Sequence, residues 1–147
     1  MTFARKWIVT RPVLVRLAAA LSVSAAFLSA AWAAEEWTAP HRASRRKNPV
    51  PADEKSVAIG KQLYTKECYS CHGTTGKGDG PAAKDLKVSP GNLSDPKLWK
   101  QTDGALFWKI STGKKPMPSM EKTWTETQRW NCINYVRTLA PKPKSDG

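Results

Sequence analysis

Cysteine and histidine are scarce in this chain: its 147 residues include three cysteines and two histidines. A structural zinc site takes about four ligands, usually in closely spaced pairs. Outside the segment Cys68–His72, however, the remaining residues of these types are the widely separated Cys132 and His41. A thioredoxin-like exchanger would set its Cys-x-x-Cys in a βαβ context, and no β-branched run precedes Cys68. Zinc binding and thiol exchange are therefore the weaker interpretations of the one cysteine pair.

A nucleotide-binding loop and an internal repeat are also missing. The glycine-rich stretch 73–81 has the wrong glycine spacing for a P-loop, and no serine or threonine follows Lys77. A flexible turn accounts for this stretch without a phosphate ligand.

Charge of either sign is absent from residues 17–34, and positively charged residues precede that run. Ala31-Trp32-Ala33 has the small-x-small form of a signal-peptidase site, so residues 1–33 are predicted to be a signal peptide cleaved after Ala33. An uncleaved membrane anchor is the alternative, because the run is just long enough to span a bilayer. No cysteine lies near the cleavage point, so a lipoprotein anchor is not indicated.

Acidic residues are few relative to basic ones, 12 against 24, which gives a formal charge of +12. Removal of the leader with its four basic residues would leave +8. A domain this basic is expected to favour partners with acidic surfaces. A solvated lysine-rich surface without a specific partner is the alternative, and nucleic acid is not expected as a partner of an exported protein.

The stretch Cys68-Tyr69-Ser70-Cys71-His72 carries the chemistry of the chain. Two thiols three positions apart can each add to one vinyl group of a haem. The histidine after the second thiol is then placed to ligate the iron from one face. The spacing therefore predicts covalent haem attachment.

The longer stretch Cys68–Gly80 resembles that of the class I (monohaem) cytochromes c of bacteria. The resemblance implies an all-α fold, a small cytochrome c domain of about three to four helices wrapped around one covalently attached haem c. It implies that Cys68 and Cys71 anchor the haem and that His72 is an axial ligand of its iron. It also implies a periplasmic location, since haem c is attached on the outer side of the bacterial membrane.

The cytochrome domain is expected over residues 53–141. A basic, proline-containing arm at 34–52 precedes it; we interpret the arm as an irregular linker, with packing onto the domain through Trp37 and Val50, or binding to a partner, as alternatives. Residues 142–147 are expected to form a disordered tail.

Three helices are predicted within that domain. The first runs from Asp53 to about Tyr69, and Gly60 within it would let another helix come close. A short helix starts at Thr102 or Asp103. The box Thr125-x-x-Gln128 starts the last helix; in the family this helix crosses the first, which would leave Cys132 buried and inert.

A second axial ligand is expected from a methionine, because thioether is the usual partner of histidine in electron carriers. Met117 and Met120 remain once Met1 of the leader is discounted. The P-M-P-S setting of Met117 resembles the ligand loop of class I cytochromes, and Met120 is the second choice. In similar proteins the proline that closes the glycine-rich loop turns its carbonyl to the imidazole. Pro81 is accordingly expected to hold the Nδ1 proton of His72.

Together these features predict a periplasmic monohaem cytochrome, with haem c as its cofactor, that carries single electrons between donor and acceptor proteins. A dedicated cytochrome subunit of a periplasmic dehydrogenase or oxidase complex is one alternative. A haem enzyme or gas sensor with an open iron position is another. Contact with the membrane is expected only if the N-terminal segment is retained. The lysines expected near the haem crevice, where they would steer docking, are Lys66, Lys77, Lys84, Lys87, Lys114 and Lys115.

Overall fold

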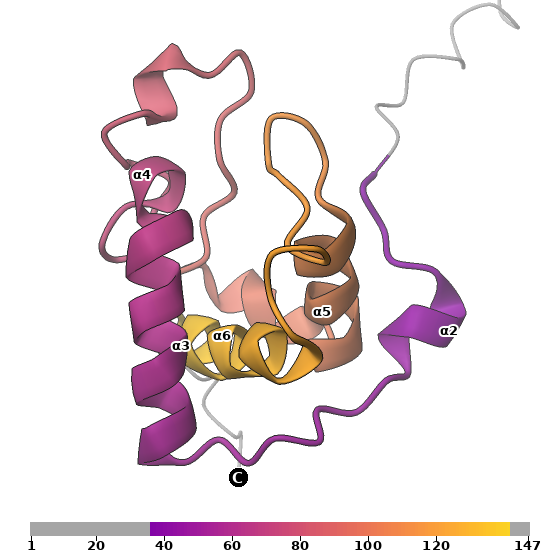
Figure 1. Cartoon of the computed structure of the whole chain (residues 1–147). Helices are drawn as coiled ribbons and strands as arrows, with labels where there is room; N and C mark the ends of the chain where they lie inside the picture. Colours follow the sequence, from indigo (N-terminus) through magenta and orange to yellow (C-terminus); the bar gives the residue numbers. More distant parts are fainter. Residues whose placement is uncertain (1–35, 142–147) are drawn as a thin grey trace, which may run out of the picture. The chain divides into compact units, whose positions relative to one another are not determined.

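Two long helices cross in the computed structural model, which describes residues 36–141 (Figure 1). α3 (Glu54–Glu67) and α6 (Glu126–Leu139) meet at Gly60. A Cβ atom on Gly60 would lie 2.0 Å from the carbonyl oxygen of Asn131, so the missing side chain lets the two backbones touch. The predicted crossing of the first and last helices is confirmed, and with it the expected all-α class of the fold.

Both crossing helices begin at caps that the sequence shows. The carboxylate of Asp53 accepts a hydrogen bond of 2.7 Å from the backbone N–H of Ser56. Thr125 and Gln128 form a reciprocal capping box at the start of α6, as predicted. Each cap satisfies N–H groups that have no partner within the first helical turn.

The core lies at this crossing. Its largest fully buried side chains are Trp130, Tyr64, Ile133 and Cys132. Cys132 is 0% exposed, which confirms the prediction of a buried cysteine. Hydrogen bonding with the Cys68 thiol and burial both raise the pKa of Cys132, so it stays an unreactive thiol.

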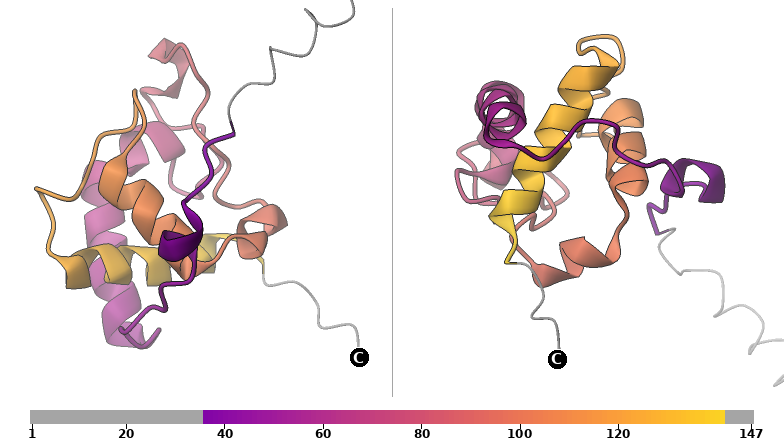
Figure 2. Two further views of the ribbon diagram at one scale, coloured as in Figure 1. Left: turned by 90° about the vertical axis from the view of Figure 1, so that its right-hand side faces the viewer. Right: turned by 90° about the horizontal axis from the view of Figure 1, so that it is seen from below.

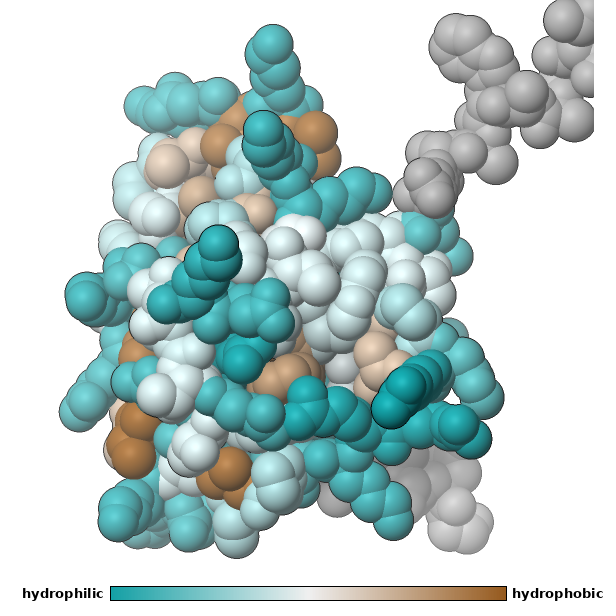
Figure 3. Space-filling model, turned by 45° about the vertical axis from the view of Figure 1, so that its right-hand side comes forward, coloured by the Kyte–Doolittle hydropathy of each residue, from teal (hydrophilic) through white to brown (hydrophobic). Residues whose placement is uncertain are grey.

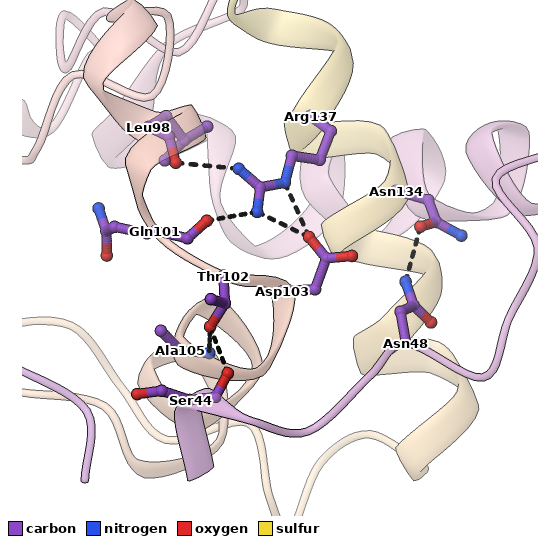
Figure 4. A network of polar contacts seen from close by, with 9 residues as sticks. All are labelled: Ser44, Asn48, Leu98, Gln101, Thr102, Asp103, Ala105, Asn134 and Arg137. Carbon is purple, nitrogen blue, oxygen red and sulfur yellow. Dashed lines mark hydrogen bonds and ion pairs between the residues drawn. The ribbon is translucent and has the colours of Figure 1, made fainter. Parts of the chain in front are cut away.

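α5 (Asp103–Thr112) packs beside α6, and the short helix η3 (Pro96–Lys100) leads into it. Arg137 of α6 joins these segments (Figure 4). Its guanidinium donates hydrogen bonds of 2.7 and 2.8 Å to the carboxylate of Asp103 and one of 2.9 Å to the carbonyl of Leu98. A planar group with several donors suits this three-way junction.

The remaining elements are short. α4 (Tyr69–His72) follows α3 after one residue, and η2 (Ala83–Asp85) lies in the loop beyond it. Lys114 and Met117 form an isolated β-bridge. In the part of the chain that the structure describes, no helix is long and apolar enough to cross a membrane.

The chain divides into two units, Met1–Trp37 and Thr38–Gly147, and the features of the fold belong to the second. The predicted signal peptide, residues 1–33, and the predicted tail, residues 142–147, lie outside the described residues.

The arm packs on the domain from residue 38 onward, so the linker interpretation is wrong for residues 38–52. It contains a one-turn helix, α2 (His41–Ser44), and crosses α6 before it enters α3 (Figure 2). Gly104 of α5 has no side chain to keep the arm away: a Cβ there would lie 2.3 Å from the carbonyl oxygen of Ala43. The buried amide of Asn134 donates to two carbonyls of the arm. These contacts join residues far apart in the sequence, which local periodicity does not reveal.

Candidate haem site

The two thiols and the imidazole come from a single helical turn. Helix α3 ends at Glu67, and the backbone N–H groups of Cys71 and His72 both donate to the carbonyl of Cys68, at 3.2 and 2.9 Å. Cys68 and Cys71 are free thiols and half-buried. The local backbone thus brings together the three groups that the motif predicts.

The imidazole of His72 is oriented by the carbonyl of Gly91, which lies 3.1 Å from Nδ1. Burial lowers the pKa of His72, while the Gly91 carbonyl acts in the opposite direction. In the neutral ring, Nδ1 donates to this carbonyl, and Nε2 then keeps its lone pair for a metal.

The contact expected for Pro81 is therefore wrong: Gly91, ten residues further on, provides the carbonyl. The reason is the path of the loop. The N–H of Gly80 donates to the Cys71 carbonyl, and the N–H of Ala82 donates to the Ser70 carbonyl. These two bonds hold the backbone on both sides of Pro81 against the turn Cys68–His72. The chain reaches the imidazole only later in the sequence, at residues 89–93. The glycine-rich pattern does not indicate that this later segment provides the contact.

Tyr64 belongs to the site although the Cys-x-x-Cys-His motif does not indicate it. Its buried hydroxyl donates a 2.7 Å hydrogen bond to the carbonyl of Gly73, directly after His72. Its ring packs against that of Tyr135, with centroids 5.2 Å apart. Burial, more than the neighbouring Cys68, raises the pKa of Tyr64, so the hydroxyl keeps its proton and remains a donor. Helix α3 therefore holds Gly73, the residue after His72, through a side-chain hydrogen bond.

The two candidate thioethers differ in their surroundings. Met120 is 6% exposed and belongs to the core cluster, and its N–H donates to the carbonyl of Ile110 at 3.0 Å. Met117 is half-buried and lies at the bridge with Lys114, where two backbone hydrogen bonds of 3.1 and 2.8 Å close a tight turn. Met120 is engaged in packing, whereas the side chain of Met117 remains partly accessible, which favours Met117 as the ligand.

These donors fit a haem c. Two reduced thiols supply the attachment points, and an imidazole and a thioether are the axial ligands typical of electron carriers. Cys68 itself packs at the edge of the core, together with other half-buried apolar side chains that a flat apolar group could cover. These side chains are Leu63, Leu93, Trp99, Ile110 and Leu139. Among residues 36–141, no cluster of three or more His, Cys, Asp and Glu side chains offers a metal site of another kind.

A family model described as cytochrome c matches residues 57–140. The chain belongs to the cytochrome c family. It is a monohaem cytochrome of class I with a covalently attached haem c, and the spacing of Cys68 and Cys71 provides the attachment points. The role of the cytochrome in haem-based electron transfer follows from the same match.

Solved structures contain similar chains. A chain of the reducing HAO-like protein complex of Kuenenia stuttgartiensis is 28% identical, with a TM-score of 0.57, and the match covers 63% of the cytochrome and 47% of that chain. Cytochrome CL of Methylophaga aminisulfidivorans MPT is 25% identical, with a TM-score of 0.46 and coverage of 58% and 56%. The cytochrome thus spans about half the length of these chains. A comparison with curated protein sequences gave no significant match.

Proposed function

We propose that this protein is a periplasmic monohaem cytochrome that carries single electrons between two redox partner proteins, with His72 and Met117 as axial ligands of the iron. The observation that carries the proposal is the turn Cys68–His72, in which Nδ1 of the histidine is already engaged by Gly91. When bound, the haem iron takes up and releases one electron at a time. With Nδ1 engaged by the Gly91 carbonyl, Nε2 is the ring nitrogen that would ligate the iron.

Ligands on both faces favour a carrier over an enzyme. If His72 and Met117 both ligate the iron, no position would remain open to oxygen or peroxide, and few bonds would change on reduction. The spectrum of the oxidised protein tests this: the thioether–iron absorption band near its red end should be present and should disappear in Met117→Ala. A band that persists in Met117→Ala and disappears in Met120→Ala would move the ligand to Met120. A protein without the band would be a candidate haem enzyme or gas sensor.

Covalent attachment is the most direct test of the cofactor site. Protein made in a host that attaches haem c should show the mass of one haem added to the mature polypeptide. The same measurement should place the N-terminus after Ala33 if the predicted leader is cleaved. A colourless product without added mass would overturn the proposal.

Acidic docking surfaces are the proposed targets on the partners. All six lysines predicted near the haem crevice are exposed, and exposed lysines raise the rate of encounter with anionic partners. Two apolar side chains lie exposed in the same stretch of chain, Tyr69 at 40% and Val88 at 62%. Figure 3 shows that hydrophilic side chains cover most of one face of the molecule, with smaller apolar areas between them.

Oxidation by ferricyanide, a small trianion, tests the charge of this surface without a known partner. The rate of the wild type should fall as ionic strength rises. Lys84→Glu should lower both the rate at low salt and its salt dependence. Lys55→Glu is the matched control, because Lys55 is also exposed but lies at the far end of α3, about 20 Å along the helix from Cys68. Equal effects of the two substitutions would contradict the proposed surface.

A dedicated subunit of a larger redox complex is the second candidate. It is favoured by the solved chain with a TM-score of 0.57, which is named as part of a protein complex. Purification of the protein at its native level from its own host would decide: a carrier elutes as a small basic monomer, whereas a subunit elutes with a stoichiometric larger protein.

A further inference from the structure

Helix α6 contains a buried arginine without an acidic partner. Arg129 is 8% exposed, and within residues 36–141 none of the ion pairs includes it. Its guanidinium lies 4.7 Å from the centre of the Phe107 ring, and its Nε has no hydrogen-bond partner in the described part of the chain. Burial of an arginine that is not paired with an acid lowers stability. A role other than general stabilisation is therefore expected for this residue.

The hydrogen bond that Arg129 does make leads to the end of α5. Its Nη1 donates to the hydroxyl of Ser111, which is 6% exposed. Ser111 lies in the last turn of α5, where backbone carbonyls have no partner within the helix. The carbonyl of Ser111 accepts instead from the hydroxyl of Ser119. Ser111 therefore links the buried arginine to the segment that follows α5.

That segment is the loop of the candidate thioether ligand. Ser119 lies two residues after Met117. On the other side of the ligand, Gly113 packs directly against the loop backbone: a Cβ there would lie 2.7 Å from the Met117 carbonyl oxygen and 2.6 Å from the carbonyl carbon of Pro118. The buried side chain of Met120 then anchors the end of the loop in the core. Between Gly113 and Met120, Ser119 provides a side-chain bond that ties the loop to a helix.

We propose that Arg129 and Ser119 are positioning residues for the Met117 thioether, and that they act together through Ser111. This inference rests on the proposed role of Met117 as an axial ligand. Arg129 fixes the side chain of Ser111 at the end of α5, and Ser119 binds the carbonyl of the same residue. The loop that carries Met117 is thereby tied to the end of α5 and, through Ser111, to α6. With haem bound, detachment of the thioether should require this link to break or stretch.

The test is Ser119→Ala in the holoprotein. Ser119 is exposed, so the substitution leaves the core unchanged. The thioether–iron band is followed against denaturant concentration, and far-UV circular dichroism follows the helices in the same samples. The substitution removes the bond to the Ser111 carbonyl and the longer one, 3.3 Å, that the hydroxyl accepts from the N–H of Glu121. Their loss should raise the equilibrium constant for loss of the band by at least about five-fold, while the transition of the helices stays in place. The reduction potential should fall in parallel, because thioether ligation raises it.

Two further variants make the result specific. Ser119→Thr keeps the hydroxyl and should restore the wild-type transition of the band. Thr112→Ala is the matched control: Thr112 follows Ser111 in α5, and its hydroxyl donates to the Trp108 carbonyl within the same helix, at 2.8 Å. Its removal should leave the band unchanged. Ser111→Ala removes the acceptor of Arg129 and should shift the transition of the band further than that of the helices.

The outcomes separate the inference from the proposed function. One result would overturn the inference alone. In it, Met117→Ala abolishes the band of the wild type, but Ser119→Ala and Thr112→Ala lose the band at the same denaturant concentration. Transitions of the band and of the helices that shift together in Ser119→Ala would also overturn it, because Ser119 would then be merely structural. A wild-type spectrum without the band would overturn both the ligand assignment and the inference.

Discussion

The two segments that contain the proposed axial ligands, His72 and Met117, are held in different ways. The anchor segment, residues 68–82, follows α3 directly, and its backbone closes on itself: Gly78 N–H donates to the His72 carbonyl and Gly80 N–H to that of Cys71. Helix α3 also holds this segment, because the hydroxyl of Tyr64 donates to the carbonyl of Gly73. The thioether loop, residues 113–120, is fixed by one β-bridge, by the buried Met120 and by the link through Ser119.

This difference predicts that the histidine and the methionine are held with different strength. The imidazole is positioned by secondary structure and by two covalent bonds to the haem, so its position changes little under stress. The thioether is positioned by a few contacts, each worth about 1 kcal/mol. Detachment of a ligand should therefore begin on the methionine side, at a free energy well below that of global unfolding.

Removal of each ligand is the strongest test of this comparison. His72→Ala should reduce the yield of holoprotein severely, because the histidine belongs to the attachment turn itself. Met117→Ala should keep the haem attached but lower the reduction potential by on the order of 0.1 V, since the choice of axial ligands spans about 0.8 V across haem proteins. Haem content per polypeptide and redox titration measure the two effects. Comparable losses of haem in both variants would contradict the asymmetry.

Two glycines allow a matched comparison of the backbones. Gly73 and Gly113 both have positive φ, 76° and 66°, so alanine is strained at either position by about 1–2 kcal/mol. At Gly113 the new Cβ would also meet backbone atoms of Pro118 and Met117 at 2.6 and 2.7 Å. At Gly73 its closest contact, at 2.0 Å, is the carboxylate of Asp79, an exposed side chain that can turn away.

Gly113→Ala should therefore lower the free energy of unfolding by about 3 kcal/mol or more, and Gly73→Ala by about 1–2 kcal/mol. Denaturant titration of both holoproteins gives the two values. In Gly113→Ala the thioether band should be lost first, whereas in Gly73→Ala the band should persist until the helices unfold. The opposite order would show that the anchor segment is the weaker of the two.

The sequence predicts those parts of the fold that short-range contacts determine. The caps at Thr125 and Thr102, the end of α5 at Gly113 and the turn from Cys68 to His72 all depend on residues within a few positions of one another. The crossing of the two long helices was expected from the resemblance to class I cytochromes c. Gly60 agrees with it, because a glycine costs stability inside a helix but allows another backbone to come close.

The contacts that the sequence did not predict join distant segments. The carbonyl that orients His72 belongs to Gly91, and nothing in the composition of residues 86–101 distinguishes its backbone from that of its neighbours. The packing of the arm likewise depends on the absence of a side chain at Gly104 and on the buried amide of Asn134. Both residues lie more than 50 positions from the arm in the sequence. Periodicity describes which face of a helix is apolar, but not which loop returns to it.

Removal of one hydroxyl tests the support of the anchor from α3. Tyr64→Phe keeps the ring but leaves the buried carbonyl of Gly73 without its donor, which should lower the free energy of unfolding by about 1–2 kcal/mol at neutral pH. Tyr69→Phe is the control, because Tyr69 is 40% exposed. The thioether band should not be lost earlier in Tyr64→Phe than the helices, since the change is on the anchor side. An early loss of the band would show that the two sides are coupled.

The smallest effect is expected from alkaline pH, and it acts on the anchor side alone. Burial raises the pKa of Tyr64 above the value of about 10 that it has in the unfolded chain. The folded state therefore holds this proton more tightly, so the contribution of Tyr64 to stability is complete below about pH 10 and is lost above it.

The free energy of unfolding of the wild type should thus fall more steeply above pH 10 than that of Tyr64→Phe, by at most about 1.4 kcal/mol per pH unit. The two proteins share every other ionisable group, so the difference between the two slopes isolates Tyr64. Denaturant titrations from pH 8 to about 11 measure it. Parallel curves would mean that the hydroxyl is not buried against Gly73 in the holoprotein, and the anchor would then depend on its backbone and its thioether bonds alone.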